Sequence, residues 1–202
     1  MIIFRYSKLG GAEYISHLDT LRHIGKTLIR AKIPVEYSQG FNPHMQIYLS
    51  PPVFVGLKSK SEYCLVETDE KAQGFIEKFN RYSPKNIKCI TAFETQKKHK
   101  IAGLIDSAEY IFFCENKFDT DKILSQNEIF VDLKGVSKDI RNKIIDLNFV
   151  TDNVLIARLS FGNDLLRADV FAKYLTDNFT KVLDYEKTEA FISGKRPEDC
   201  LE

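Results

Sequence analysis

The chain has 202 residues, 44% hydrophobic and 28% charged, a composition that excludes a disordered protein and allows a sizeable core in one large or two small domains. Its 29 Lys and Arg nearly balance its 28 Asp and Glu, so the total charge alone indicates neither a polyanion-binding protein nor an acidic one. The two halves differ, however. Residues 1–100 hold 16 Lys and Arg against 9 Asp and Glu, a net charge of +7, and residues 101–202 hold 13 against 19, a net charge of −6.

The first half contains signals for four strands and two helices. Ser16 precedes an amphipathic segment and Asp19 follows three residues later, a variant of the capping box that predicts a helix over residues 17–32. The apolar residues of this helix recur at helical spacing and are expected to face a sheet; they are Leu18, Leu21, Ile24, Leu28 and Ala31. Apolar runs, Gly and Pro breaks and a second amphipathic segment place the remaining elements. These are strands over 2–8, 46–49, 62–67 and 87–93, and a helix over 70–82.

The second half contains a similar succession of elements. We predict strands over 108–115, 128–134, 143–150, 154–161 and 185–192, and helices over 119–125 and 165–179. Each half then follows a βαββαβ order, the second with one additional strand. The sequence thus predicts an α+β protein of two tandem ferredoxin-like domains, a basic one over residues 1–97 and an acidic one over residues 104–202.

The cysteine spacing argues against a metal centre. Cys64, Cys89, Cys114 and Cys200 are too far apart for a zinc or iron–sulfur motif, and the first three lie in apolar runs, where a thiol behaves as a small hydrophobe. We expect reduced cysteines, no metal and no cofactor in this chain, and a cytoplasmic location. Because no apolar run approaches the ~18 residues that span a bilayer, we expect neither membrane insertion nor secretion.

Basic and aromatic residues of the first half suggest an anionic ligand. Arg22, Lys26 and Arg30 stand at successive i+4 steps, so they line up on one helix face, where they would either track a phosphate backbone or form an ordinary solvated surface. Tyr37 and Phe41 are candidates for stacking on bases, although Phe41 would equally serve as a loop anchor. The candidate nucleic-acid or anion-binding residues are Lys8, Ser16, His17, Arg22, Lys26, Arg30, Phe41, Asn42 and His44.

Two short segments hold most of the chemically reactive side chains. His17 lies at a predicted helix N-terminus, where unpaired N–H groups favour an anion, and His44 ends a turn-rich loop. We predict that these two segments meet in a single basic surface. His17 is then a candidate general acid or base, with His44 or Tyr37 assisting, although no paired carboxylate or nucleophile supports this role and Ser16 is better explained as a helix cap than as a nucleophile.

The same segments carry a family resemblance. Tyr14-Ile15-Ser16-His17-Leu18-Asp19 and Tyr37-Ser38-Gln39-Gly40-Phe41-Asn42-Pro43-His44 together resemble motifs of the bacterial radical-SAM-associated proteins. Members of that family occur beside, or as C-terminal extensions of, radical-SAM proteins. The resemblance implies a radical-SAM protein as partner, and the absence of a three-cysteine motif here implies that any radical chemistry takes place on that partner.

Three functions therefore remain open at this stage. The first is an accessory RNA-binding or substrate-presenting module that works with a separate radical-SAM enzyme in RNA or translation-related modification. The second is an RNA-cleaving or other phosphoryl-transfer enzyme that uses His17 as general acid or base. The third is a protein-interaction adaptor whose acidic half contacts a basic partner. The sequence favours a non-catalytic role because no established catalytic motif is present.

Overall fold

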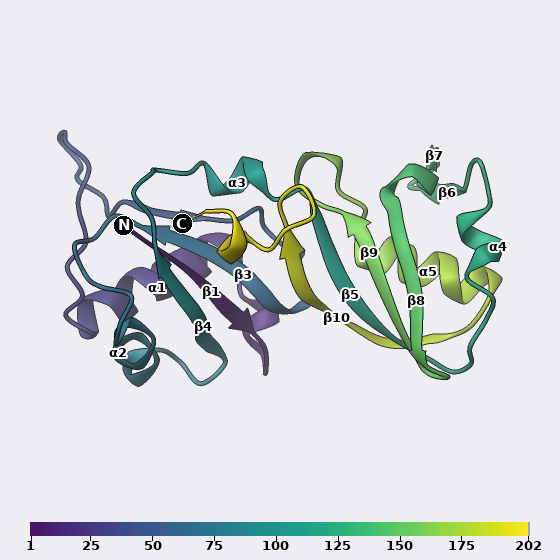
Figure 1. The fold of residues 1–202 in the computed structure, drawn as a ribbon, viewed down its shortest axis with the longest axis horizontal. Helices are drawn as coiled ribbons and strands as arrows, with labels where there is room; N and C mark the ends of the chain where they lie inside the picture. The colour runs from purple at the N-terminus through teal and green to yellow at the C-terminus, as the bar shows by residue number, and fades with distance from the viewer. Residues whose placement is uncertain (202) are drawn as a thin grey trace.

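The computed structural model describes residues 1–201 and shows a mixed α/β protein with a mostly sheet core (Figure 1). Within this range eight strands form one sheet in the order β4-β1-β3-β10-β5-β9-β8, with β2 paired to β3. Helices α1, α2 and α5 lie behind the sheet in Figure 1 and so cover one of its faces. The strands are β1 (Ile2–Lys8), β2 (Ile47–Leu49), β3 (Lys58–Val66), β4 (Ile87–Glu94), β5 (Ser107–Cys114), β6 (Phe130–Leu133), β7 (Val136–Asp139), β8 (Ile144–Thr151), β9 (Val154–Ser160) and β10 (Val182–Phe191). The helices are α1 (His17–Arg30), α2 (Phe75–Tyr82), α3 (Ile101–Leu104), α4 (Asp121–Leu124) and α5 (Ala168–Asn178).

Strand β1 is the centre of the first half. It pairs antiparallel with β3 and β4, and β2 pairs antiparallel with β3, which gives the order β4-β1-β3-β2. The buried apolar side chains form two clusters. Because side chains alternate across a strand, Phe4 packs in one cluster with α2, and its neighbour Ile3 packs in the second. The Phe4 ring centroid lies 5.3 Å from that of Phe75 and 5.0 Å from that of Phe79, both on α2. Each of these buried side chains stabilises the fold by about 1.5–3 kcal/mol.

The second half repeats this strand order around β5. Strand β5 pairs antiparallel with β9 and β10, and β8 pairs antiparallel with β9, which gives β10-β5-β9-β8. Helix α5 packs on this part of the sheet through Phe171, whose ring meets that of Phe112 edge-on at 5.5 Å. Strands β6 and β7 pair only with each other, in a two-stranded sheet that lies apart from the main one (Figure 1).

A buried ion pair marks the seam between the two halves. Strands β3 and β10 run parallel there and pair only at Lys58 with Glu186 and at Ser59 with Lys187. Lys187 is completely buried, and its Nζ lies 2.9 Å from Oε1 of the equally inaccessible Glu62. Ser59 Oγ donates a second hydrogen bond to the same oxygen at 2.7 Å. The pair therefore satisfies two buried charges and joins the halves through side chains as well as backbone.

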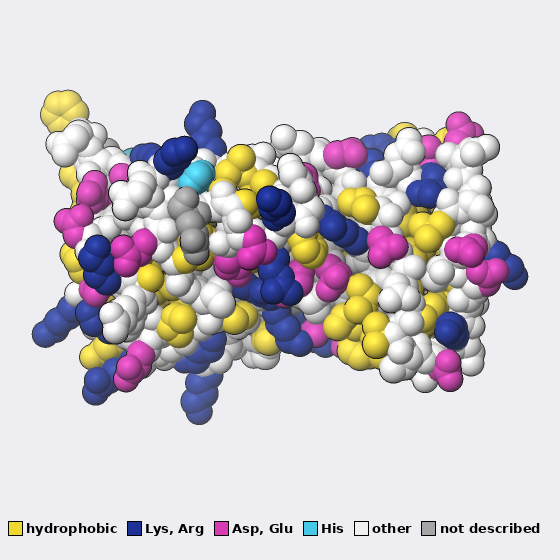
Figure 2. All heavy atoms as spheres, in the orientation of Figure 1, with side chains coloured by type: hydrophobic (Ala, Val, Ile, Leu, Met, Phe, Trp, Pro, Cys, Tyr) yellow, Lys and Arg dark blue, Asp and Glu magenta, His cyan; other side chains and the backbone are white. Residues whose placement is uncertain are grey.

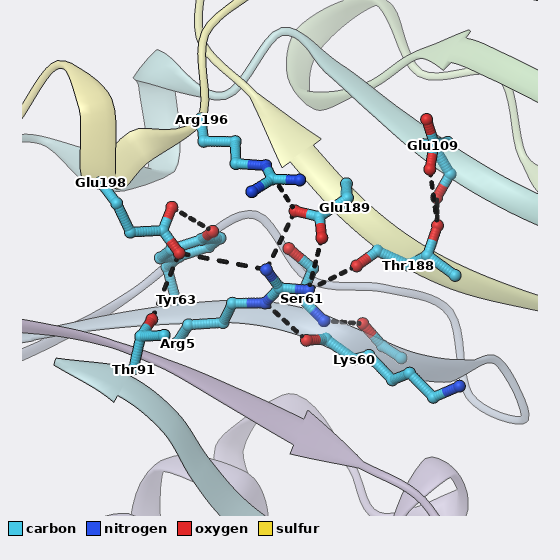
Figure 3. A network of polar contacts seen from close by, with 11 residues as sticks. Arg5, Lys60, Ser61, Tyr63, Thr91, Glu109, Thr188, Glu189, Arg196 and Glu198 are labelled. Carbon is cyan, nitrogen blue, oxygen red and sulfur yellow. Dashed lines mark hydrogen bonds and ion pairs between the residues drawn. The ribbon is translucent and has the colours of Figure 1, made fainter. Parts of the chain in front are cut away.

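A second polar network joins the halves on the sheet face away from the helices (Figure 3). Arg5 of β1 donates to both carboxylate oxygens of Glu189 on β10, at 2.9 and 3.0 Å. The C-terminal segment returns to the first half, where Glu198 accepts hydrogen bonds from the Tyr63 hydroxyl at 2.9 Å and the Thr91 hydroxyl at 3.2 Å. The segment around Glu198 thus contacts the first half.

Helix α3 lies on the connection between the halves and contacts β2, β3 and the turn at Gly162–Asp164. Ile101 and Ile105 bury their side chains in the core at the two ends of this short segment. The turn requires glycine at position 162, because φ is +69° there and an added Cβ would lie 2.5 Å from the carbonyl oxygen of Ile105. This close backbone contact fixes the position of α3 against the second half.

The sequence-based elements agree with most of the structure and differ from it in instructive places. Helix α1 begins at residue 17 as predicted and ends at Arg30, two residues before the predicted end. Helix α2 begins at Phe75 rather than at residue 70, and β3 begins four residues before the predicted strand. Leu18 was expected to be buried but is 64% exposed. Thr20 and Thr27 take buried places on α1 because their hydroxyls donate to the carbonyls of Ser16 and His23, which turns Leu18 outward. The strand predicted over 128–134 forms as β6 (Phe130–Leu133), but outside the main sheet.

We predict that the buried ion pair contributes strongly to stability. Glu62→Gln removes the negative charge and leaves the Lys187 ammonium buried without a counter-charge, which should lower the free energy of unfolding by about 3–5 kcal/mol in urea denaturation. Asp177→Asn is the matched control, because it breaks the exposed pair with Lys173 on α5 and should cost at most about 0.5 kcal/mol. Equal losses in the two variants would contradict the role given to the seam.

Candidate functional site

A cavity of about 720 Å³ lies between α1, β2 and the connection that leads into α3. This volume lies within the ~300–1,000 Å³ typical of ligand sites. Aliphatic and aromatic side chains form part of its wall, and basic side chains from two separate segments form the rest. The lining residues are His17, Leu21, Ile47, Tyr48, Leu49, Lys98, His99, Lys100, Ile101, Ala102 and Gly103.

A second cavity of about 330 Å³ continues along α1 and shares Leu21 and Ile47 with the first. Its lining residues are Leu21, Arg22, Gly25, Lys26, Ile29, His44, Met45 and Ile47. Gly25 matters here because it has no side chain: the position of its missing Cβ is 3.3 Å from the Met45 sulfur, so the loop packs directly on the helix. We call the two adjoining cavities the α1 groove.

The α1 groove has a positive lining. Lys98, Lys100, Arg22 and Lys26 line it, and among residues 1–201 no Asp or Glu lines either cavity. Two of these charges have counter-charges just outside. Lys98 Nζ lies 2.5 Å from Glu67 Oε1 and 4.7 Å from the Tyr48 ring centroid, and Arg22 pairs with Asp19 at 2.9 Å.

Lys26 and Lys100 have no carboxylate within 4.0 Å in the part of the chain that the structure describes. In Figure 2, Lys and Arg side chains project beside a histidine over the segment that leads into α3. These charges favour an anionic ligand in the α1 groove.

The start of α1 holds His17 at the mouth of the larger cavity. Ser16 caps the helix, since its Oγ accepts a hydrogen bond from the Asp19 backbone N–H at 3.1 Å, which confirms the role predicted from the sequence. Lys8 is buried, and its Nζ donates to the Ile15 carbonyl at 2.9 Å. The sequence predicts that Lys8 presents its charge to a ligand. In the structure this charge instead holds the backbone just before the helix cap.

Burial and neighbouring charges set the protonation of His17. Part of its surface reaches solvent, but the surrounding protein atoms disfavour the charged imidazolium, and this desolvation lowers the pKa of His17 below its ordinary value. The Glu62 carboxylate raises this pKa and the Lys8 ammonium lowers it, both to smaller extents. At neutral pH His17 is therefore mainly the uncharged ring, which donates a hydrogen bond from one nitrogen and accepts one at the other.

The loop over residues 38–44 closes on itself beside the smaller cavity. Ser38 Oγ lies 2.8 Å from His44 Nδ1 and accepts a hydrogen bond from the His44 backbone N–H at 3.1 Å. Tyr37 and Met45 form an isolated bridge at the base of the loop. Phe41 near the tip is fully exposed, so it is no core anchor, and the loop stands away from the body in Figure 1.

The structure brings some of the sequence-predicted residues together and leaves others apart. His17 lines the larger cavity, whereas Arg22, Lys26 and His44 line the smaller one. The other candidates are outside the α1 groove: Arg30, Tyr37, Phe41 and Asn42 are exposed, and Ser16 is occupied as a cap. The two motif segments therefore meet one continuous groove, but at different points along it.

Sequence reasoning missed the part of the site that comes from residues 98–103. The basic run Lys97, Lys98 and Lys100 is visible in the sequence, but its composition fits a solvated linker as well as an extension of the basic surface. Nothing local in the sequence indicates that Ile101 and Gly103 close a cavity against α1, because this contact depends on how α3 packs against β2 and the turn at Gly162–Asp164.

The structure also bears on metal sites and membrane spans. Among residues 1–201 no cluster of three or more His, Cys, Asp or Glu side chains is arranged to hold a metal ion. None of the helices in the described range combines the length and apolar character needed to cross a membrane.

The fold and the groove define a mixed α/β protein with a basic ligand-sized surface groove along one helix. The chain belongs to the bacterial family described as "Uncharacterized protein conserved in bacteria (DUF2344)", whose sequence profile matches residues 1–168. This range includes every residue that lines the α1 groove. No curated protein matches the chain.

We predict that His17 titrates below the ordinary histidine pKa of about 6.5. The unfolded chain then takes up this proton at a higher pH than the folded protein does, so the free energy of unfolding falls as the pH drops below about 6.5 toward the folded pKa. Imidazole NMR signals give the midpoint directly. His17→Gln should remove that part of the acid-side loss of stability, and a midpoint at or above 6.5 would contradict the assigned environment.

Proposed function

We propose that this protein is a non-catalytic, accessory RNA-binding module that works with a separate radical-SAM enzyme. The observation that carries the proposal is the α1 groove, whose lining includes four Lys and Arg side chains and, within residues 1–201, no carboxylate. RNA is a polyanion, and binding to Lys and Arg releases the counterions condensed on its phosphates. A surface of this composition therefore supports binding of RNA better than binding of a cationic or neutral ligand.

Exposed aromatic side chains on the loop that ends at His44, which itself lines the smaller cavity, add a second argument for RNA. Phe41 is fully exposed on the loop and Tyr37 is half-exposed at its base. Exposed aromatic rings next to basic side chains are typical of surfaces on which unpaired bases stack. Leu18 and Ile29 are also exposed, at opposite ends of α1, so the helix presents apolar and basic side chains together.

The strand order supports the finer description of the fold as two tandem ferredoxin-like units. The first half has the order β4-β1-β3-β2 and the second β10-β5-β9-β8, both fully antiparallel within the half, with helices on one face. We propose that residues 1–97 and 104–202 are two such units, fused through the β3 and β10 pairing. A shared fold alone is no argument for a shared function.

The radical-SAM partner is proposed from the sequence resemblance of the two motif segments. The proposed division of labour is that the partner performs the radical chemistry and this chain presents the RNA. Three of the four cysteines support this division because Cys64, Cys89 and Cys114 are buried, and burial raises the pKa of each thiol, which disfavours the thiolate that ligates iron.

The enzymatic alternative has weaker support. His17 and His44 line different cavities, and His44 Nδ1 lies at hydrogen-bond distance from Ser38 within its own loop. An acid–base pair has to address one reacting centre, so this arrangement favours binding over phosphoryl transfer. The adaptor alternative draws only on the net negative charge of residues 101–202.

We predict that charge reversal on α1 weakens RNA binding. Combining Arg22→Glu, Lys26→Glu and Arg30→Glu should reduce affinity for an unstructured RNA at least tenfold at low salt, and should lower the slope of log K against log salt by roughly two, because fewer phosphates are neutralised. The control combines Lys117→Glu, Lys122→Glu and Lys138→Glu, which changes the net charge equally in the second half. Fluorescence anisotropy measures both; equal losses would refute a localised site.

We also predict a direct complex with the radical-SAM protein. When a tagged copy of this chain is co-expressed with a radical-SAM protein of the same organism, the two should elute together in size-exclusion chromatography. Ribonuclease is present throughout, so that RNA cannot bridge them. Separate elution of two folded proteins would contradict the proposed partnership while leaving the RNA-binding proposal intact.

A further inference from the structure

We propose that the larger cavity of the α1 groove receives one unstacked base of a single-stranded RNA, and that the smaller cavity and α1 hold the backbone beside it. This inference rests on the proposed function and specifies the class of RNA. It follows from two separate features of the groove: the composition of the cavity wall and the placement of basic side chains along α1.

The cavity wall suits the flat, mostly apolar surface of a base. Leu21, Ile47, Leu49 and Ile101 supply aliphatic contacts, and Tyr48 supplies an aromatic ring. A volume of about 720 Å³ leaves space for a base together with its sugar. A phosphate alone would leave most of this apolar wall in contact with water, so the cavity is poorly matched to a simple anion.

The basic side chains are placed to hold phosphates on both sides of that base. Lys98 and Lys100 line the larger cavity, and Arg22 and Lys26 line the smaller one farther along α1. From His17 to Ile29 the helix rises by about 18 Å. A single strand covers this distance with a few nucleotides, comparable to the smaller site sizes of about 4–16 nucleotides in single-strand-binding proteins.

The same geometry disfavours a duplex. Bases in an RNA helix stay stacked and paired, and the deep, narrow major groove keeps their edges from side chains. Extracting one base into a cavity would cost a few kcal/mol of lost stacking and pairing. An unpaired strand has already lost these interactions, so we expect single-stranded RNA to bind more tightly than duplex of the same length.

The cavity wall also predicts weak discrimination among the four bases. Within residues 1–201 it contains no Asn, Gln, Asp or Glu, the side chains that read a base edge through paired donors and acceptors. Its polar groups are the ring nitrogens of His17 and His99, the Tyr48 hydroxyl and two ammonium groups. Stacking and apolar contact accept any base, so recognition should depend on the presence of a base more than on its identity.

Three probes of about eight nucleotides separate the terms of this proposal. They are an unstructured RNA, the same strand annealed to its complement, and a strand of equal length in which every nucleotide is abasic. Anisotropy titrations with the full chain at one salt concentration should rank them in that order, with the unstructured RNA at least tenfold tighter than the duplex. A duplex that binds as tightly as the single strand, or an abasic strand that binds equally, would overturn the inference.

A substitution that fills the cavity tests the location. Gly103 lines the cavity, and a Cβ added there meets no atom within 4 Å, so Gly103→Phe adds a ring in open space without displacing the core. We expect at least a tenfold loss for the unstructured RNA and little change for the abasic strand. Gln73→Phe is the matched control, since it adds the same ring at an exposed position next to α2, outside the α1 groove.

The outcomes distinguish this inference from the proposed function on which it rests. If none of the three probes binds, the RNA-binding proposal itself fails. If all three bind equally and the α1 charge reversal weakens them, the protein is an RNA-binding module that reads only phosphates, and the base-receiving cavity is wrong. Unchanged binding of the unstructured RNA in Gly103→Phe, with the melting temperature unchanged, would likewise refute the cavity as the site.

Discussion

The buried ion pair between Glu62 and Lys187 is the constraint on which the arrangement of this molecule depends. Strands β3 and β10 share only two backbone pairs, so the seam between the halves relies on side chains. Removing either charge would strand the other in a region without water, which makes separation of the halves costly. The seam in turn sets where α3 lies, because α3 contacts β2 and β3 on one side and the turn at Gly162–Asp164 on the other. The segment over residues 98–103, which forms one wall of the larger cavity, thus leads into a helix that packs against both halves.

The α1 groove shows how the packing of α1 produces a surface that is both apolar and basic. Thr20 and Thr27 occupy the buried side of α1 with their hydroxyls bonded to the helix backbone, so the helix turns Leu18 and Ile29 outward. Basic side chains on the neighbouring turns stay exposed, and the connection to α3 brings two further lysines to the opposite rim. A surface that combines apolar contact with positive charge is suited to a strand whose bases are apolar on their faces and whose backbone is anionic.

The elements that could be predicted from the sequence are those set by residues close together in the chain. Contacts between distant parts of the chain could not be predicted. The strand over residues 2–8 and the start of α1 were predictable because a continuous apolar run and a Ser16 cap act within a few residues. The exposure of Leu18 could not be predicted, because Thr20 takes a buried place on the helix instead. Helical periodicity does not distinguish a threonine whose hydroxyl is bonded to the helix backbone from one that faces solvent. No spacing in the sequence indicates that β6 pairs with β7 or that Lys98 approaches Tyr48. Both contacts depend on tertiary packing. His17 was found from its motif, and its partners in the cavity were not.

Photo-crosslinking gives the most direct test of the central claim that RNA binds along α1. A short unstructured RNA that contains 4-thiouridine is irradiated with the protein, and the crosslinked peptides are identified by mass spectrometry. Our account predicts crosslinks in residues 17–29, 44–49 and 98–103, the three segments that line the α1 groove. Crosslinks confined to residues 107–201, or spread evenly over the surface, would contradict it.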